Sequence, residues 1–254
     1  MSQYGVQLFN RYNLTVATAD DVNYTLVSSG QLFQGSFYDF QGAKCLKMDV
    51  TGLNAPLLFL VMDNNNKRLS QIPACSSGSR LNAGDGAWTK YIQVYKWGNL
   101  NFDYVQYYLF DRWIPPERST YGLQIFDGGG GIIFDGGWNF LKLRDVIWMD
   151  PGYPNHANDV NGSNWTMVGN VGGGNWALSM PFAREWTYYD GIYSSRLNEC
   201  SHTDGAGNIF CSLVKTGDYL DIYPYNDWIH RMRSQIMICD VTGLPNTLNP
   251  RALS

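Results

Sequence analysis

Apolar and polar residues alternate with a period of two in several short segments of the chain. The clearest examples are residues 4–10, 44–50, 104–110 and 123–127. Alternation places every second side chain on one face of an extended strand. Residues 57–62 instead form a short continuous apolar run, which is typical of a strand buried on both faces. The pattern therefore predicts a structure made mainly of short strands.

Composition agrees with this expectation. Aromatic residues make up 15% of the 254 residues, charged residues only 16%, and 27 residues are Gly. A chain poor in Glu and Lys but rich in Tyr, Trp and Gly disfavours helices and favours strands joined by tight turns. We predict an all-β fold, with one helical turn over residues 225–233.

One seven-residue phrase occurs twice. Residues 4–10 (YGVQLFN) return 117 residues later as residues 121–127 (YGLQIFD), and each copy leads into a predicted hairpin. Pro115 and Pro116 stand just before the second copy, where they would interrupt a sheet ladder. We therefore expect two tandem β-sandwich-like domains.

The expected N-terminal β-sandwich module covers residues 1–118, and residues 91–95 and 104–110 form its closing hairpin. The expected C-terminal module covers residues 119–254 and is rich in aromatic residues and loops. It opens with a hairpin whose turn contains four consecutive Gly residues, 128–131, because Gly accepts the positive φ that such turns need.

The second copy of the phrase, its Gly-rich turn and the following Ile133-Phe134-Asp135 resemble the N-terminal hairpin of β-rich proteins in the tail tips and tail fibres of long-tailed bacteriophages. Residues 105–111 resemble the closing strand of such modules. The first copy departs from the pattern, because residues 11–16 replace the Gly-rich turn.

This resemblance implies a structural or adaptor component of a virion tail, made in the host cytoplasm, that acts by contacting other phage tail proteins. It also implies a homo-oligomer, threefold or a multiple of threefold. It carries over no catalytic residue, so we expect no enzyme. The alternative is a tail module for host attachment that recognises a surface glycan or receptor.

Charge and hydropathy narrow the classes of partner. The net charge of −4 argues against nucleic-acid binding, which needs clustered Lys and Arg. The longest apolar run, residues 56–62, is far shorter than the ~20 residues of a membrane span. We expect no membrane insertion, and the N-terminus shows no pattern of a secretory signal.

Aromatic residues crowd the second module and are its candidate binding residues. We single out Trp165, Trp176, Trp186, Tyr188 and Tyr153. Trp and Tyr stack on sugar rings and anchor protein interfaces, but they also fill the cores of β-sandwiches. Both interpretations stay open, and Trp165 and Trp176 are the first candidates for a glycan platform because they stand beside loops rich in Gly and Asn.

Cysteine and histidine give weaker signals. Cys200 and Cys211 flank a predicted hairpin turn over residues 204–208 and are a disulfide candidate, although free buried thiols are the default for a chain without a signal peptide. A zinc site formed by His202 with these two thiols is a minor alternative. We expect no metal and no cofactor.

Glycosidase chemistry needs two carboxyl groups about 5–10 Å apart. Glu185, paired with Asp190 or Glu199, offers the only tempting set. The chain has no nucleophile-elbow or phosphate-loop motif. The sequence therefore favours binding over catalysis.

Overall fold

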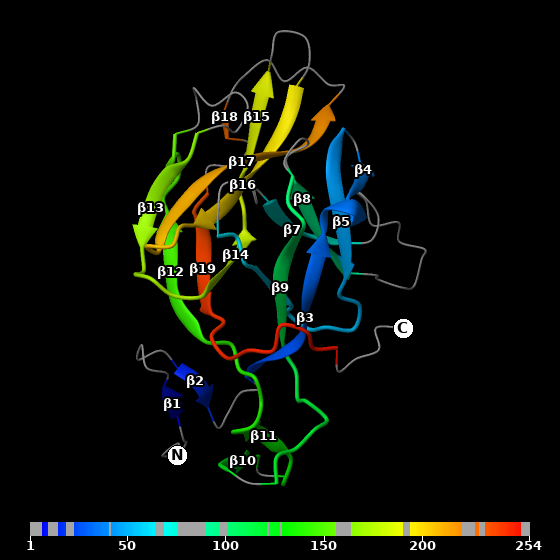
Figure 1. Cartoon of the computed structure of the whole chain (residues 1–254), viewed down its shortest axis with the longest axis vertical. Coiled ribbons are helices and arrows are strands. Elements are labelled where there is room, and N and C mark those ends of the chain that lie inside the picture. Colours follow the sequence, from blue (N-terminus) through cyan, green and yellow to red (C-terminus); the bar gives the residue numbers. More distant parts are fainter. Residues whose placement is uncertain are drawn as a thin grey trace.

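The computed structural model of the chain is built almost wholly of strands, which confirms the all-β prediction (Figure 1). It describes residues 7–9, 15–18, 23–40, 42–63, 69–75, 90–96, 101–120, 122–127, 129–155, 164–189, 194–219, 227–228 and 232–249. Within these ranges the one helical element is the 3₁₀ turn η1 (Gln34–Ser36). The predicted helical turn at 225–233 is wrong where it can be checked, because Asp227–Trp228 is a short strand, β18; residues 225, 226 and 229–231 lie outside the described residues.

Three antiparallel sheets and two separate hairpins make up the fold. The largest sheet has the order β12 (Leu143–Met149), β19 (Ser234–Asp240), β14 (Trp176–Phe182), β6 (Leu57–Leu60), β9 (Tyr104–Arg112) and β3 (Tyr24–Phe33). A four-stranded sheet has the order β4 (Tyr38–Phe40), β5 (Ala43–Asp49), β8 (Lys90–Lys96) and β7 (Leu69–Cys75). A five-stranded sheet has the order β13 (Thr166–Asn170), β17 (Asn208–Tyr219), β16 (Ser194–Thr203), β15 (Glu185–Tyr189) and β18.

The repeated phrase forms the same hairpin twice. The hairpins are β1 (Gln7–Phe9) with β2 (Thr15–Thr18), and β10 (Gln124–Phe126) with β11 (Ile132–Asp135). Every pair of the first hairpin corresponds to a pair of the second at the 117-residue offset, and both hairpins have a register shift before the last pair. Both lie at the lower end of the molecule, apart from the three sheets (Figure 1). A sequence repeat of seven residues therefore marks a longer structural repeat.

The same correspondence continues into the large sheet. The strand after the first hairpin, β3, pairs with β9, and the strand after the second, β12, pairs with β19. β3 carries a bulge between Leu26 and Ser28, and β12 carries one between Leu143 and Asp145, again 117 residues further on. Each half of the chain thus contributes three strands in the same arrangement.

The two halves join where β6 meets β14. Leu178 pairs with Leu60 in antiparallel orientation, which places Ser179 beside Phe59. Phe59 and Ser179 occupy corresponding positions in the two halves. Leu58 pairs with Leu109, which lies opposite the bulge of β3, and Leu178 pairs with Ile238, which lies opposite the bulge of β12. The junction therefore follows an internal twofold relation between the halves.

The predicted division into modules 1–118 and 119–254 stays a prediction. What the structure shows is that strands from both modules share the six-stranded sheet. Leu58 and Leu60 from the first half and Leu178 and Met180 from the second also belong to one buried cluster, which fills the space between this sheet and the other two.

Residues 91–95 and 104–110 do not form the predicted closing hairpin. β8 pairs with β5 and β7, whereas β9 pairs with β3 and β6, so the two strands lie in different sheets. The side chain of Gln34 lies at this change of direction, where its Oε1 accepts a hydrogen bond of 2.7 Å from the backbone N–H of Phe102. This contact joins the segment before β9 to the residue that follows β3.

The second hairpin is closed by a buried carboxylate. Asp135, directly opposite Gln124, accepts hydrogen bonds from the Gln124 side-chain amide (2.8 Å), from the backbone N–H of Ser119 (2.9 Å) and of Gly137 (2.8 Å), and from the Ser119 hydroxyl. Burial would raise the pKa of Asp135, but these hydrogen bonds outweigh it and lower the pKa to about 2. Gln124 of the repeated phrase and Asp135 of the following strand are thus structural in this hairpin.

Replacing Asp135 by Asn should destabilise the protein by about 2 kcal/mol at neutral pH, because buried donors lose a charged acceptor. A pKa depressed below its unfolded value of 3.8 gives stability that is present above that pH and lost as the pH falls towards about 2. Urea unfolding at a series of pH values should show this acid loss in the native chain and a shallower one in Asp135→Asn. Equal slopes would contradict the role of this carboxylate.

Candidate functional site

A buried ion pair lies at the centre of the second half of the chain. The side chains of Arg184 and Glu199 are fully buried, with Nη2 of Arg184 2.6 Å from Oε1 of Glu199. The other carboxylate oxygen accepts a hydrogen bond of 2.8 Å from the backbone N–H of Arg184. Burying two charges is costly even when they are paired. The groups that this pair holds in place therefore indicate which part of the structure requires it.

The guanidinium of Arg184 holds three loop carbonyls. Its Nη1 donates to the backbone oxygen of Asp150 (2.8 Å) and of Met232 (3.4 Å), and its Nη2 donates to that of Tyr153. The guanidinium also lies over the ring of Trp228, with Cζ of Arg184 4.3 Å from the ring centroid. Arg184 therefore fixes the chain just after β12 and just before β19.

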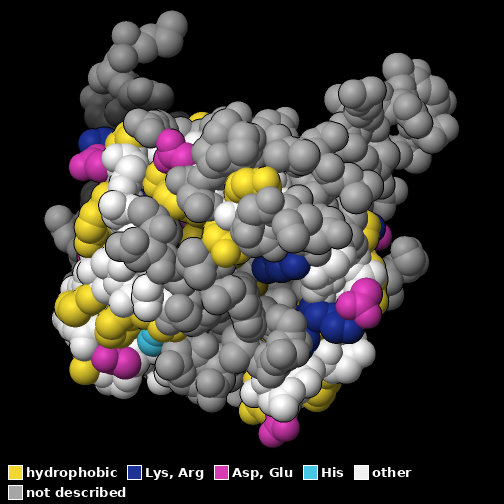
Figure 2. Space-filling model, turned by 90° about the horizontal axis from the view of Figure 1, so that it is seen from above, with side chains coloured by type: hydrophobic (Ala, Val, Ile, Leu, Met, Phe, Trp, Pro, Cys, Tyr) yellow, Lys and Arg dark blue, Asp and Glu magenta, His cyan; other side chains and the backbone are white. Residues whose placement is uncertain are grey.

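Large apolar side chains lie exposed around these loops. We call this group the end patch: Trp148, Tyr153, Met167, Phe182 and Met232, with exposed fractions between 47% and 63%. Trp148 on β12 and Phe182 on β14 both pair with Gln235 of the strand between them, so the three side chains share one face of the sheet. Seen from above, apolar side chains gather on the side of β12 and β13, and most of the cationic ones on the side of β4 and β5 (Figure 2).

The two edges of the six-stranded sheet differ. On β3, the backbone N–H and carbonyl of Ser29 both bond to Leu248, so the C-terminal segment covers this edge. The corresponding residue on β12 is Val146, whose N–H donates to the side chain of Asp145 (2.8 Å). Within the described ranges, no segment pairs with this edge of β12. Trp148 likewise corresponds to Gln31. The end patch therefore belongs to the second half alone and is not a requirement of the repeated fold.

Two of the predicted binding residues are core residues. Trp176 is 5% exposed and its indole N–H donates to the carbonyl of Gly172 (2.7 Å). Trp186 is 3% exposed and packs edge to face against Trp228. The prediction that these two rings form a surface platform is wrong, because both fill space between strands.

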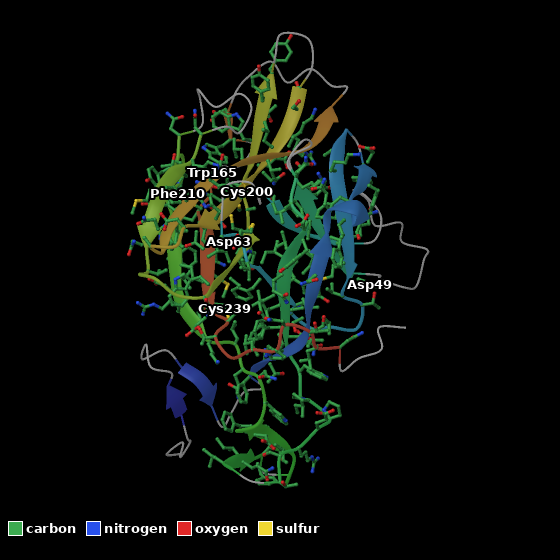
Figure 3. The ribbon with its side chains drawn as sticks, in the orientation of Figure 1. Asp49, Asp63, Trp165, Cys200, Phe210 and Cys239 are labelled. Carbon is green, nitrogen blue, oxygen red and sulfur yellow. The ribbon has the colours of Figure 1, made fainter. Side chains whose placement is uncertain are left out.

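The other three differ in exposure. Tyr188 is half-buried against the cluster of Trp186 and Trp228. Trp165 is also half-buried, with its ring 4.3 Å from that of His202, which in turn stacks on Phe210 at 4.8 Å (Figure 3). Only Tyr153 is as exposed as a surface platform requires, and it is part of the end patch.

The disulfide prediction is wrong. The turn over residues 204–208 does connect β16 and β17, but Cys200 pairs with Ser212 and Cys211 with Ser201. A register offset of one residue places the two thiols on opposite faces of the sheet, and both are buried and form no disulfide bond. Burial, followed by the charge of Glu199, raises the pKa of Cys211 well above its usual value.

The described residues provide neither the predicted zinc site nor a pair of glycosidase carboxyl groups on one face of the sheet. No group of three His, Cys, Asp or Glu side chains suited to a metal ion occurs in the described part of the chain. Glu185 pairs with Asn198, so the next residue, Glu199, points to the opposite face of the sheet. Glu185 forms its own ion pair with Arg196, and Asp190 lies outside the described residues.

Comparison with protein-family models, curated proteins and solved structures finds no match to this chain. Among the described residues, no helix has the length and apolar character needed to cross a membrane.

The buried pair Arg184–Glu199 and the exposed residues Trp148 and Phe182 of the end patch were not predicted as site residues from the sequence. Glu199 lies in a polar segment and Arg184 directly follows Phe182 and Ala183, and neither segment has a periodic pattern that indicates a buried charge. Trp148 was detectable in principle: β12 carries apolar residues on both faces, with Val146 and Trp148 on one and Ile147 and Met149 on the other. An edge strand that is apolar on both faces indicates a second, external contact.

Replacing Glu199 by Gln should destabilise the protein by about 3 kcal/mol or more, because Arg184 would keep a buried charge without its carboxylate. Glu185→Gln is the matched control: it breaks the partly exposed pair with Arg196 and should cost less than about 1 kcal/mol. Guanidinium unfolding of the three proteins measures both values. Equal losses in the two variants would show that Arg184–Glu199 is not a central clamp.

Proposed function

We propose that this chain is a structural adaptor of a bacteriophage tail, associated with the tail tip or fibre, and that it works through protein–protein interfaces. The resemblance of the repeated phrase to tail-protein hairpins gives the context of the virion, and the repeat of that hairpin supports two tandem β-sandwich-like units. The proposal includes symmetric self-association, threefold or a multiple of it.

The observation that carries the proposal is the exposed pair Trp148 and Phe182. Their side chains are 60% and 63% exposed on one rigid sheet face. Interface hot spots are enriched in aromatic residues that project from well-packed surroundings. The buried Arg184–Glu199 pair supplies that rigidity, since it anchors the loops on either side of this face.

A second contact region fits the same function. Leu123 and Phe126 of the β10 hairpin are 54% and 52% exposed. The hairpin precedes the start of β12, and Trp148 lies close to the end of that strand, so the two apolar regions are separated along its length (Figure 1). An adaptor needs two such separate surfaces, one for each neighbour.

The double variant Trp148→Ser, Phe182→Ser should leave stability within about 1 kcal/mol, because both side chains are exposed. It should weaken docking by about 2 kcal/mol or more, roughly thirtyfold in affinity. Quantitative mass spectrometry of purified particles, after complementation with each variant, measures incorporation. Phe33→Ser is the control, since Phe33 is 53% exposed on the first half. Normal incorporation of the double variant would contradict the proposal.

A groove favours the second candidate function, recognition of a host glycan. It has a volume of about 710 Å³ and is lined by both halves of the chain, with Gln31, Gln106 and Asp63 as polar groups and Tyr104 as the exposed aromatic wall. Amide and carboxylate groups beside an aromatic ring suit the hydroxyls and apolar face of a sugar.

Tyr104→Ala should abolish retention of the chain on host envelope glycans if this groove is a receptor site. Tyr38→Ala is the matched control, because Tyr38 is 42% exposed against 43% for Tyr104 and lies outside the groove. Retention of the native chain and of Tyr104→Ala to the same extent would remove this second candidate.

A further inference from the structure

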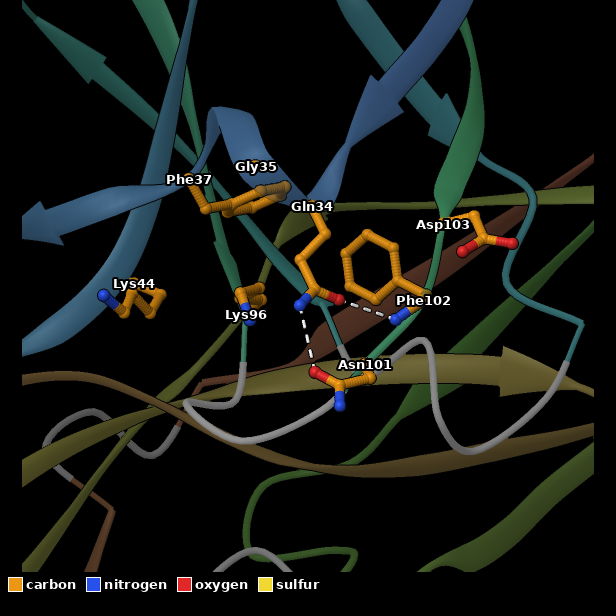
Figure 4. A pocket seen from close by; sticks show the side chains of 8 residues that line it. All are labelled: Gln34, Gly35, Phe37, Lys44, Lys96, Asn101, Phe102 and Asp103. Carbon is orange, nitrogen blue, oxygen red and sulfur yellow. Dashed lines mark hydrogen bonds between the residues drawn. The ribbon is translucent and has the colours of Figure 1, made fainter.

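A second pocket lies in the first half of the chain, beside η1 (Figure 4). It has a volume of about 860 Å³, within the range of pockets that hold small molecules. Its lining comes from the end of β3 with η1, from β5 and β8, and from the segment before β9. The residues are Gln34, Gly35, Phe37, Lys44, Lys96, Asn101, Phe102 and Asp103.

Two lysines stand directly opposite each other in this lining. Lys44 on β5 pairs with Lys96 on β8, an arrangement that is unfavourable for like charges. Lys96 is only 4% exposed, and its pKa is lowered by burial and then by the charge of Lys44. Lys44 has its own carboxylate, Asp39, at 2.8 Å. Lys96 therefore places a cation in the wall of the pocket.

The neutral part of the lining is held in a fixed geometry. Gln34 donates from Nε2 to Oδ1 of Asn101 (3.0 Å) and accepts at Oε1 from the backbone N–H of Phe102 (2.7 Å), as the dashed lines of Figure 4 show. The Phe102 ring is braced edge to face by Phe37, with centroids 6.0 Å apart, and lies 5.9 Å from Nζ of Lys96. The pocket therefore offers cations, amides and an aromatic face together.

We infer that this pocket binds an acidic sugar residue, with its carboxylate towards Lys96 and Lys44 and its hydroxyls towards Gln34 and Asn101. The ring of Phe102 supplies the apolar wall against which a pyranose face stacks. Asp103, the one carboxylate among these lining residues, lies on the other side of the Phe102 ring from Lys96 and Lys44 (Figure 4). The inference does not rest on the tail proposal, because these residues lie outside the end patch.

Isothermal titration of the full chain with glucuronate, with glucose and with acetate tests the inference. Glucuronate should bind at least about tenfold more tightly than either other probe, because only it engages both the charged and the neutral groups. Equal binding of acetate and glucuronate would overturn the claim that the pocket recognises a sugar, because the carboxylate alone would then account for the binding. Absence of glucuronate binding would overturn the site itself.

Variants assign the binding to this pocket. Lys96→Met should weaken glucuronate binding about tenfold, the loss that one charged hydrogen bond brings, while keeping the volume of the buried side chain. Asn101→Ala, at an exposed position, keeps the test valid if Lys96→Met does not fold, and should weaken glucuronate but not acetate. Lys142→Gln is the matched control, since Lys142 donates to the carbonyl of Thr242 in the second half. Equal binding in all four proteins would overturn the assignment.

Discussion

The antiparallel pairing of β6 with β14 is the constraint on which the rest of the structure depends. Each half of the chain brings three strands to the large sheet, and without this junction each half would expose the edge of a strand as apolar as Leu57–Leu60. An exposed apolar edge strand is a site of uncontrolled association. The chain closes this edge with its own second copy, which buries Phe59 and Leu60 completely.

Because the scaffold is repeated, the differences between the halves carry the functional information. The hairpins, the bulges of β3 and β12 and the junction strands correspond closely. The edges do not: the C-terminal segment covers β3 at Ser29, whereas β12 presents Trp148 beside Phe182. The lysine pocket, in turn, depends on η1, an element that has no counterpart among the described residues of the second half. The repeated strands form one common frame, and each half of the chain presents a different surface on it.

Local patterns predicted the parts of the fold that local physics decides. The alternation in residues 44–50 and 104–110 and the Gly-rich turn after residue 127 correspond to β5, β9 and the β10–β11 hairpin, because period, burial and turn chemistry all agree there. The path between sheets was not predictable in this way. β8 and β9 lie in different sheets, and no periodic signal marks the contacts of Gln34 with Asn101, Phe102 and Asp103 that join the end of β3 to the segment before β9.

The candidate site was harder to predict for a related reason. β16 is polar in sequence, yet Glu199, Ser201 and His202 on it are buried. Glu199 is buried together with Arg184, which precedes β15 and faces Glu199 across the pairing of β15 with β16. The aromatic residues show the converse: Trp176 follows a loop rich in Gly and Asn, yet its ring is buried, as is that of Trp186 in β15. Burial of these groups is a property of the tertiary structure.

The central claim is that this repeated β-structure functions through the surface it presents to neighbouring proteins. Hydroxyl-radical footprinting of the free chain and of intact particles tests it most directly. The account predicts that Trp148, Phe182 and Met232 are oxidised readily in the free chain and are protected in the particle, while the buried Trp176 is protected in both. Equal oxidation of the three exposed residues in the two samples, or the absence of the chain from the particle, would contradict it.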